Sequence, residues 1–217
     1  MTSSSVARSA RSRKTGWRWI ITAVAVIVLL AAMGLDTTYV STQTAKTDSN
    51  VFSPEAFGKA EFPKVQAAIE KRAVDAPTLA KAIAQDQDAA AKKYGVQGNI
   101  GPEMSVKFTG VAGKGDSGIY TVKVPDVPDA VSIRVQTGPA INGTELRDAT
   151  GTISFGQFRN QIEYQNAGAA LNNEMKKEVL AKVDTGKLTG KTISVTGVFT
   201  LINPHNWLVT PVRLSVQ

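Results

Sequence analysis

The sequence contains no cysteine and a single histidine, and these two shortages exclude several kinds of chemistry. Without thiols the chain forms no disulfide, builds no thiolate metal site and carries no lipid on a cysteine. Zinc chemistry needs more ligands than His205 alone supplies, and His205 follows Pro204 in a predicted turn where an exposed side chain is expected. We therefore expect no catalytic residue, no metal, no cofactor and no enzymatic activity. A hydrolase with two distant carboxylates is the weaker alternative.

No acidic residue precedes Asp36, and in this N-terminal part of the sequence five basic residues come before an apolar run. This pattern is typical of a segment that enters a membrane with its N-terminus in the cytoplasm, so the remainder is expected to be extracytoplasmic. We predict a cytoplasmic basic tail over residues 1–19, a single-pass transmembrane anchor over 20–35 and a polar stalk over 36–50. The run has no clear small-x-small cleavage site, which favours a retained anchor over a cleaved signal peptide.

The positive charge of the chain is concentrated in the predicted tail. The formal net charge is +7, and only +2 of it belongs to the residues after Trp19. A nucleic-acid-binding surface would carry clustered basic residues on the exported part. We therefore expect no nucleic-acid partner.

Helical periodicity comes first in the exported part and strand periodicity follows. Pro63 fits the first turn of one helix, and Asp75 and Gly95 fit the two ends of a second. A third helix is predicted from Gly156 to about Val183. Alternating apolar residues predict strands near 106–110, 119–124, 131–135, 192–200 and 207–216, with a turn at 113–116. The large side chains expected in the core are Trp207, Phe108, Phe155 and Phe158.

Two strand segments resemble each other. Residues 106–111 (VKFTGV) align with residues 193–198 (ISVTGV) at an offset of 87, with the glycine in the same place. Each is preceded by a helical stretch and followed by a second strand, so the pattern favours an internal duplication over coincidence. If it is a duplication, each half is too small to bury a good core alone, and the halves should share sheets or exchange strands.

The segment between these repeats is polar, and its residues carry a resemblance. It reads QTGPAINGTELRDA over 136–149 and ISFGQFRNQ over 153–161. This pattern resembles the signature of a bacterial family of predicted periplasmic lipoproteins of unknown function, often encoded beside sugar ABC transporters. The resemblance implies tandem barrels of the oligonucleotide/oligosaccharide-binding (OB) type with exchanged C-terminal strands. Many members carry a lipidation cysteine that this chain lacks, which favours a protein anchor in its place.

The expected fold is therefore α+β with mainly antiparallel β structure. The transmembrane helix is followed by two OB-like barrels with exchanged strands and intervening helices. We place the first subdomain, with two N-terminal helices, at 51–150 and the second, with one helix, at 151–217.

The same polar segment supplies the candidate ligand-binding residues. Arg147 and Asp148 can form a charge-assisted pair, and such groups suit a sugar or a polar peptide. The alternative, which we favour, is that these groups satisfy backbone atoms inside the protein. The expected partners are the membrane and either a polar small molecule or components of a sugar ABC transporter, and the competing role is a purely structural scaffold. The candidate residues are Gln136, Asn142, Thr144, Arg147, Asp148, Asn160 and Gln161.

Overall fold

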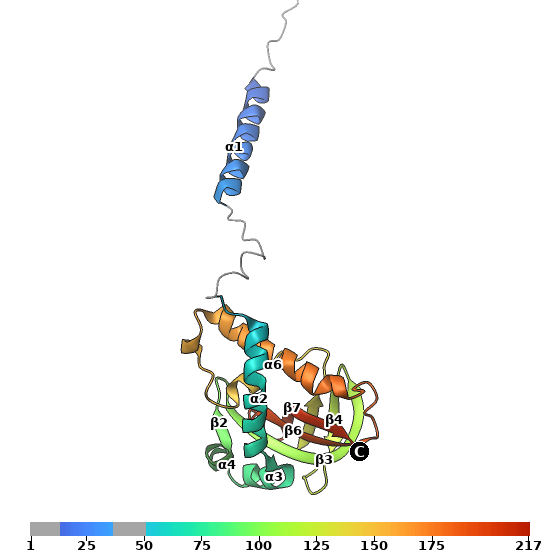
Figure 1. Ribbon diagram of the computed structural model, residues 1–217. Coiled ribbons are helices and arrows are strands. Elements are labelled where there is room, and N and C mark those ends of the chain that lie inside the picture. Colours follow the sequence, from blue (N-terminus) through green and yellow to red (C-terminus); the bar gives the residue numbers. More distant parts are fainter. Residues whose placement is uncertain (1–13, 37–50) are drawn as a thin grey trace, which may run out of the picture. The chain divides into compact units, whose positions relative to one another are not determined.

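The computed structural model describes residues 14–36 and 51–217, and in the first helix it describes side chains for residues 19–31 only (Figure 1). The predicted tail over 1–13 and most of the predicted stalk, 37–50, lie outside the described residues. The chain divides into two compact units, Met1–Val51 and Phe52–Gln217.

The first unit contains one helix, α1 (Lys14–Asp36). Its described side chains, from Trp19 to Ala31, are all exposed, and the large apolar ones are exposed by 50–74%. Within the described parts of the chain, no helix has both the length and the apolar character that a membrane crossing requires. The helix predicted over 20–35 is therefore present, whereas its transmembrane character is not shown.

Three helices open the second unit, where two were predicted: α2 (Pro54–Arg72), α3 (Ala76–Gln85) and α4 (Gln87–Tyr94). The position predicted for Pro63 is wrong, because α2 begins nine residues earlier and contains Pro63 in its interior. Ser53 caps α2, and Pro54 occupies its first turn, where a proline costs no hydrogen bond. The predicted second helix is interrupted at Asp86, whose carboxylate accepts from the Ala89 N–H and starts α4.

One sheet of seven strands forms the body of the unit. The strands are β1 (Val74–Asp75), β2 (Gly95–Gln97), β3 (Pro102–Asp116), β4 (Ile119–Lys123), β5 (Ser132–Gln136), β6 (Thr192–Thr200) and β7 (Asn206–Val216). The five longer strands follow the order β3-β4-β5-β7-β6, and the pairing of β3 with β6 closes them into a barrel. All pairings within the barrel are antiparallel except that of β5 with β7.

The described residues form one barrel, so the prediction of two barrels is wrong. The two similar segments lie in β3 and β6, which pair with each other, so that Val106 is opposite Gly197 and Gly110 is opposite Ile193. The first predicted half supplies three barrel strands and the second supplies two. Neither set closes alone, because its edge strands would have unpaired backbone groups. The expected sharing of a sheet between the halves is confirmed in this form.

The hairpin between β3 and β4 turns later than predicted. Ser117 and Gly118 have φ angles of 51° and 77°, and the backbone reverses there. Glycine adopts this left-handed conformation without the steric penalty of a side chain. The predicted turn residues Gly113 and Gly115 lie inside β3, where the register with β4 shifts as in a bulge.

A long connection between β5 and β6 carries the polar segment and the main helix of the unit. It contains α5 (Glu145–Asp148), η2 (Phe155–Gln157), α6 (Gln161–Glu178) and η3 (Leu180–Lys182). The single helix predicted here is thus divided. Among its predicted inward residues Leu171 and Met175 are buried, whereas Ile162 is exposed by 69% and was assigned to the wrong face.

The core prediction holds fully for two of the four aromatic residues and in part for a third. Trp207 is fully buried and stacks on Phe199 with ring centroids 4.7 Å apart, Phe108 is buried, and Phe158 is half-buried. Phe155 is exposed by 50%, which contradicts the prediction. It lies in the short helix η2, where only one side of its ring packs edge-on against Tyr164.

Candidate functional site

Arg147 and Asp148 form a buried ion pair in α5. The Arg147 Nε donates to Asp148 Oδ1 over 2.8 Å, and Nη2 donates to Oδ2 over 3.1 Å. Both side chains are at least nine-tenths buried. Such a two-point contact between a guanidinium and a carboxylate is strong and fixes both groups. The pair predicted from the sequence is therefore confirmed.

The remaining atoms of this pair contact protein groups. The Arg147 guanidinium lies 3.7 Å from the centre of the Tyr164 ring, and Nη1 donates to the Tyr164 carbonyl. Asp148 accepts hydrogen bonds from the Thr144 hydroxyl and, over 3.4 Å each, from Asn99 Nδ2 and the Tyr164 hydroxyl. We call Asn99, Thr144, Arg147, Asp148 and Tyr164 the polar centre. Its ionic groups are satisfied from inside the protein.

Two further carboxyl groups lie close enough to influence the polar centre electrostatically. Burial raises the pKa of Glu103 from 4.5 to about 8, although the Thr200 hydroxyl donates to both of its oxygens. The charges of Glu145 and Asp148 raise this pKa further, and Arg147 opposes them. Burial also raises the pKa of Glu145. One buried cation thus faces three acidic groups, and Glu103 is protonated at neutral pH.

The candidate ligand-binding residues do not converge on one open surface. Thr144, Arg147 and Asp148 belong to the polar centre, while Gln136 is buried and donates to the Thr210 hydroxyl. Asn160 is exposed and caps α6 by accepting from the Glu163 N–H. Asn142 and Gln161 are exposed at separate positions along the crossover, and His205 is exposed in a turn as expected.

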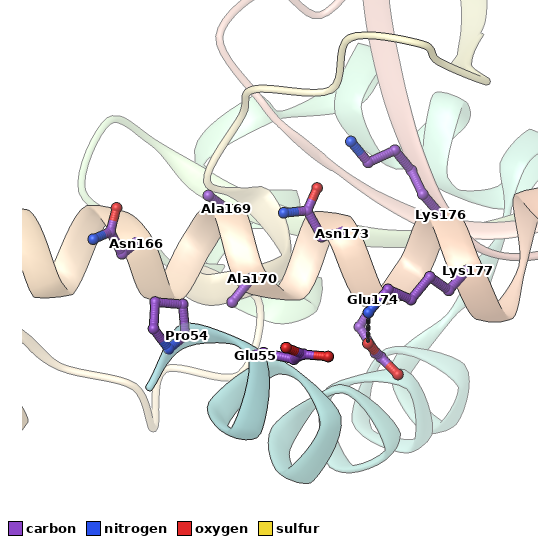
Figure 2. A pocket seen from close by; sticks show the side chains of 9 residues that line it. All are labelled: Pro54, Glu55, Asn166, Ala169, Ala170, Asn173, Glu174, Lys176 and Lys177. Atoms are coloured by element: carbon purple, nitrogen blue, oxygen red, sulfur yellow. Dashed lines mark hydrogen bonds and ion pairs between the residues drawn. The ribbon is translucent and has the colours of Figure 1, made fainter. Parts of the chain in front are cut away.

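A different surface has the concave shape of a binding site. A groove of about 650 Å³ lies between the first turn of α2 and one face of α6, as Figure 2 shows. The two helices approach closely at Gly58, where a Cβ would come within 2.7 Å of the Ala170 carbonyl oxygen. The groove is lined by Pro54, Glu55, Asn166, Ala169, Ala170, Asn173, Glu174, Lys176 and Lys177.

Several polar side chains of this groove have no partner within the described residues. Lys177 and Glu174 form an ion pair of 3.4 Å, but the side chains of Glu55, Lys176, Asn166 and Asn173 make no hydrogen bond or ion pair. Asn166 and Asn173 lie two turns apart on α6, with the small Ala169 and Ala170 between them. Two exposed amides beside small apolar side chains can hold a ligand by donating and accepting hydrogen bonds.

The sequence analysis missed this groove. Its signal in the sequence is the spacing of Asn166, Ala169, Ala170 and Asn173, which places small and amide side chains on one face of a helix. That face becomes a groove only because α2 begins at Pro54 and crosses beside it. The start of α2 was assigned to the wrong residue, so the second wall could not be anticipated.

Comparisons with other proteins agree with the barrel topology. The profile of a family described as "predicted periplasmic lipoprotein (DUF2291)" matches residues 24–215. An OB-fold protein from Thermotoga maritima, known from a crystal structure, is similar with a TM-score of 0.61 and 20% sequence identity. The similarity covers 76% of this chain and 99% of that protein, which shows the OB fold. No curated protein matches the chain significantly.

Proposed function

The chain belongs to this family of predicted periplasmic lipoproteins, and on that premise we propose that it is a non-enzymatic binding module anchored outside the membrane by α1. The family description implies a membrane anchor. A lipid anchor of the usual bacterial kind needs a cysteine, and this sequence has none. The anchor is therefore assigned to the helix itself, with the OB domain on the extracytoplasmic side.

The backbone length of α1 and the apolar character of its described side chains support this assignment, although those side chains, Trp19 to Ala31, are by themselves too few to cross a bilayer. A helix of 23 residues is about 34 Å long, against roughly 30 Å for the hydrocarbon core of a bilayer. The described side chains from Trp19 to Ala31 account for only part of that length, and they are uncharged and exposed. Exposed apolar surface of this extent is stable in lipid rather than in water.

The groove between α2 and α6 carries the proposal of binding. Its unpaired Asn166 and Asn173 amides, together with Glu55 and Lys176, offer donors and acceptors from both walls. This set suits the hydroxyl groups of a sugar or a similar polar small molecule. We propose that the domain binds such a ligand as an accessory component of a sugar ABC transporter.

A binding measurement tests this proposal directly. The full chain in nanodiscs is titrated by calorimetry with a panel of neutral pentoses, hexoses and their disaccharides. At least one sugar should bind, and Asn166→Ala and Asn173→Ala should each weaken its binding about five- to ten-fold, which corresponds to one lost hydrogen bond. Asn142→Ala, an exposed amide of the crossover, is the matched control.

A purely structural role is the second candidate function. The observation that favours it is the polar centre, in which Arg147 and Asp148 are satisfied by internal partners. A scaffold would bind none of the sugars, and the groove variants would behave like the wild-type protein. That outcome would replace the binding proposal with the structural one.

A further inference from the structure

Three large apolar side chains are exposed around the first turn of α6. They are Ile100, exposed by 75%, Phe155 and Ile162, and we call them the apolar patch. The Tyr164 ring lies 5.7 Å from the Phe155 ring, and its hydroxyl accepts from Asn99 Nδ2, next to Ile100. Ile162 is the second residue of α6 and points away from the core. The three side chains therefore lie in the region where α6 begins and where the loop before β3 approaches it.

The patch stands on a rigid base. Phe52, Phe57, Phe158 and Tyr164 form a chain of ring contacts with centroids 5.4–5.7 Å apart, which joins the beginnings of α2 and α6. Exposed apolar side chains on a fixed base cannot withdraw into the core. Large apolar side chains exposed together in one region of a protein mark a surface that contacts another protein or a membrane.

The position of the patch in the chain favours lipid as its occupant. The domain begins at Phe52, whose ring packs on Phe158, so the patch lies at the end of the domain from which the chain leads to α1. Residues 37–50 intervene, and fully extended they reach at most about 50 Å. A surface that is tethered to a bilayer through so short a segment needs only weak affinity to rest on it, because the tether gives a high effective concentration.

The polar residues around the patch suit a lipid headgroup region. Arg159 is exposed between Phe155 and Ile162 in the sequence, and its guanidinium forms no ion pair within the described residues. The exposed Asn160 and Gln161 amides lie beside it. In proteins that bind at a membrane interface, apolar side chains enter the boundary of the acyl chains by about 5–10 Å. A cationic side chain stays at the level of the headgroups.

We propose that the apolar patch rests on the outer surface of the membrane that anchors the chain, with Phe155 and Ile162 inserted among the lipids. This inference rests on the proposed anchoring by α1. It orients the domain so that the start of α6 faces the bilayer. The α6 wall of the groove begins at Asn166, one turn after Ile162, so the groove then opens close to the membrane surface.

The absence of cysteine makes a site-specific test simple. Ile162→Cys and Phe155→Cys are labelled with an environment-sensitive fluorophore in the full chain. The proteins are reconstituted in vesicles of phosphatidylethanolamine and phosphatidylglycerol that contain a lipid with a nitroxide near the top of its acyl chain. Val111→Cys is the matched control, because Val111 is similarly exposed at 47% but lies nine residues along β3 from Pro102, roughly 30 Å of strand.

The expected result is a blue-shifted emission and several-fold stronger quenching at positions 155 and 162 than at position 111. A second variant, Ile100→Cys combined with Ile162→Glu, should lose the quenching that Ile100→Cys alone shows. If the chain sediments with the vesicles but the labels at all positions are quenched equally weakly, the patch does not touch lipid. The proposed anchoring by α1 would be retained in that case, and only this inference would be overturned. If the chain does not sediment with vesicles, both proposals are overturned. If the labels are shielded from water in native membranes but not in the lipid vesicles, a protein covers the patch, which also overturns the inference.

Discussion

The polar centre and the groove between α2 and α6 contain similar residue types in opposite circumstances. In the polar centre every charged group has an internal partner, and Asp148 accepts from Arg147, Thr144 and Tyr164. In the groove Asn166, Asn173 and Lys176 have none within the described residues. The difference separates polar residues that hold the fold together from polar residues that are available to a ligand, which residue type alone does not reveal.

The largest effect is expected from breaking the ion pair of the polar centre. Arg147→Ala leaves the buried Asp148 carboxylate without its cation and removes the contact with the Tyr164 ring. We expect a loss of about 3–5 kcal/mol in the free energy of unfolding, measured by chemical denaturation. Asn142→Ala on the same crossover is the control. A loss equal to that of the control would mean that the pair contributes nothing to folding.

Glu103→Gln should stabilise the protein in a pH-dependent way. Burial raises the pKa of Glu103 from 4.5 to about 8, so the folded state binds a proton that the unfolded state releases between these values. The stability due to protonated Glu103 is full below pH 4.5 and is lost as the pH rises through 8. Glutamine does not ionise and can still accept from Thr200. The variant should therefore gain roughly 2–4 kcal/mol at pH 9 and nothing at pH 4.5, as thermal melts across pH would show. A constant difference at all pH values would contradict the raised pKa.

Asn160→Ala should have an intermediate effect. Its side chain accepts from the Glu163 N–H and caps α6, and removal of such a cap costs about 1 kcal/mol. Asn160→Asp, which preserves the acceptor, should restore most of this stability. The comparison with Asn166→Ala on the same helix tests whether position at the helix end, and not the amide itself, decides the cost.

The smallest effect on stability is expected in the groove. Asn173→Ala removes an exposed amide that has no partner within the described residues, so the free energy of unfolding, measured by chemical denaturation, should change by less than about 0.5 kcal/mol. Sugar binding should weaken at the same time. A large loss of stability here would erase the distinction between the two regions and assign the groove a structural role.

Much of the fold could be predicted because it is determined by local patterns. The strand predicted over 192–200 matches β6, and the alternating residues of β4 and β7 were assigned to within one residue at each end. Pairing partners depend on contacts between distant residues, which periodicity does not encode. The likeness of residues 106–111 to 193–198 predicted an internal duplication and the family resemblance implied two barrels, whereas the two segments pair within one barrel.

The candidate site was predictable only in part, and for the same reason. Arg147 and Asp148 are adjacent in the sequence, so their pairing could be foreseen. Their burial depends on Tyr164 and Asn99, which come from α6 and from the loop between β2 and β3. The groove depends on how α2 crosses α6, and no local pattern specifies the crossing of two helices.

The pairing of β3 with β6 has a consequence for the order of folding. The two strands are separated by the whole crossover, and β7 at the C-terminal end of the described chain must insert between β5 and β6. If the domain emerges from an export channel in sequence order, β3, β4 and β5 form an open sheet until the last strands arrive. Open edges of this kind pair with other chains, so slow export should favour aggregation, and a chaperone that shields β3 and β5 during translocation would suppress it.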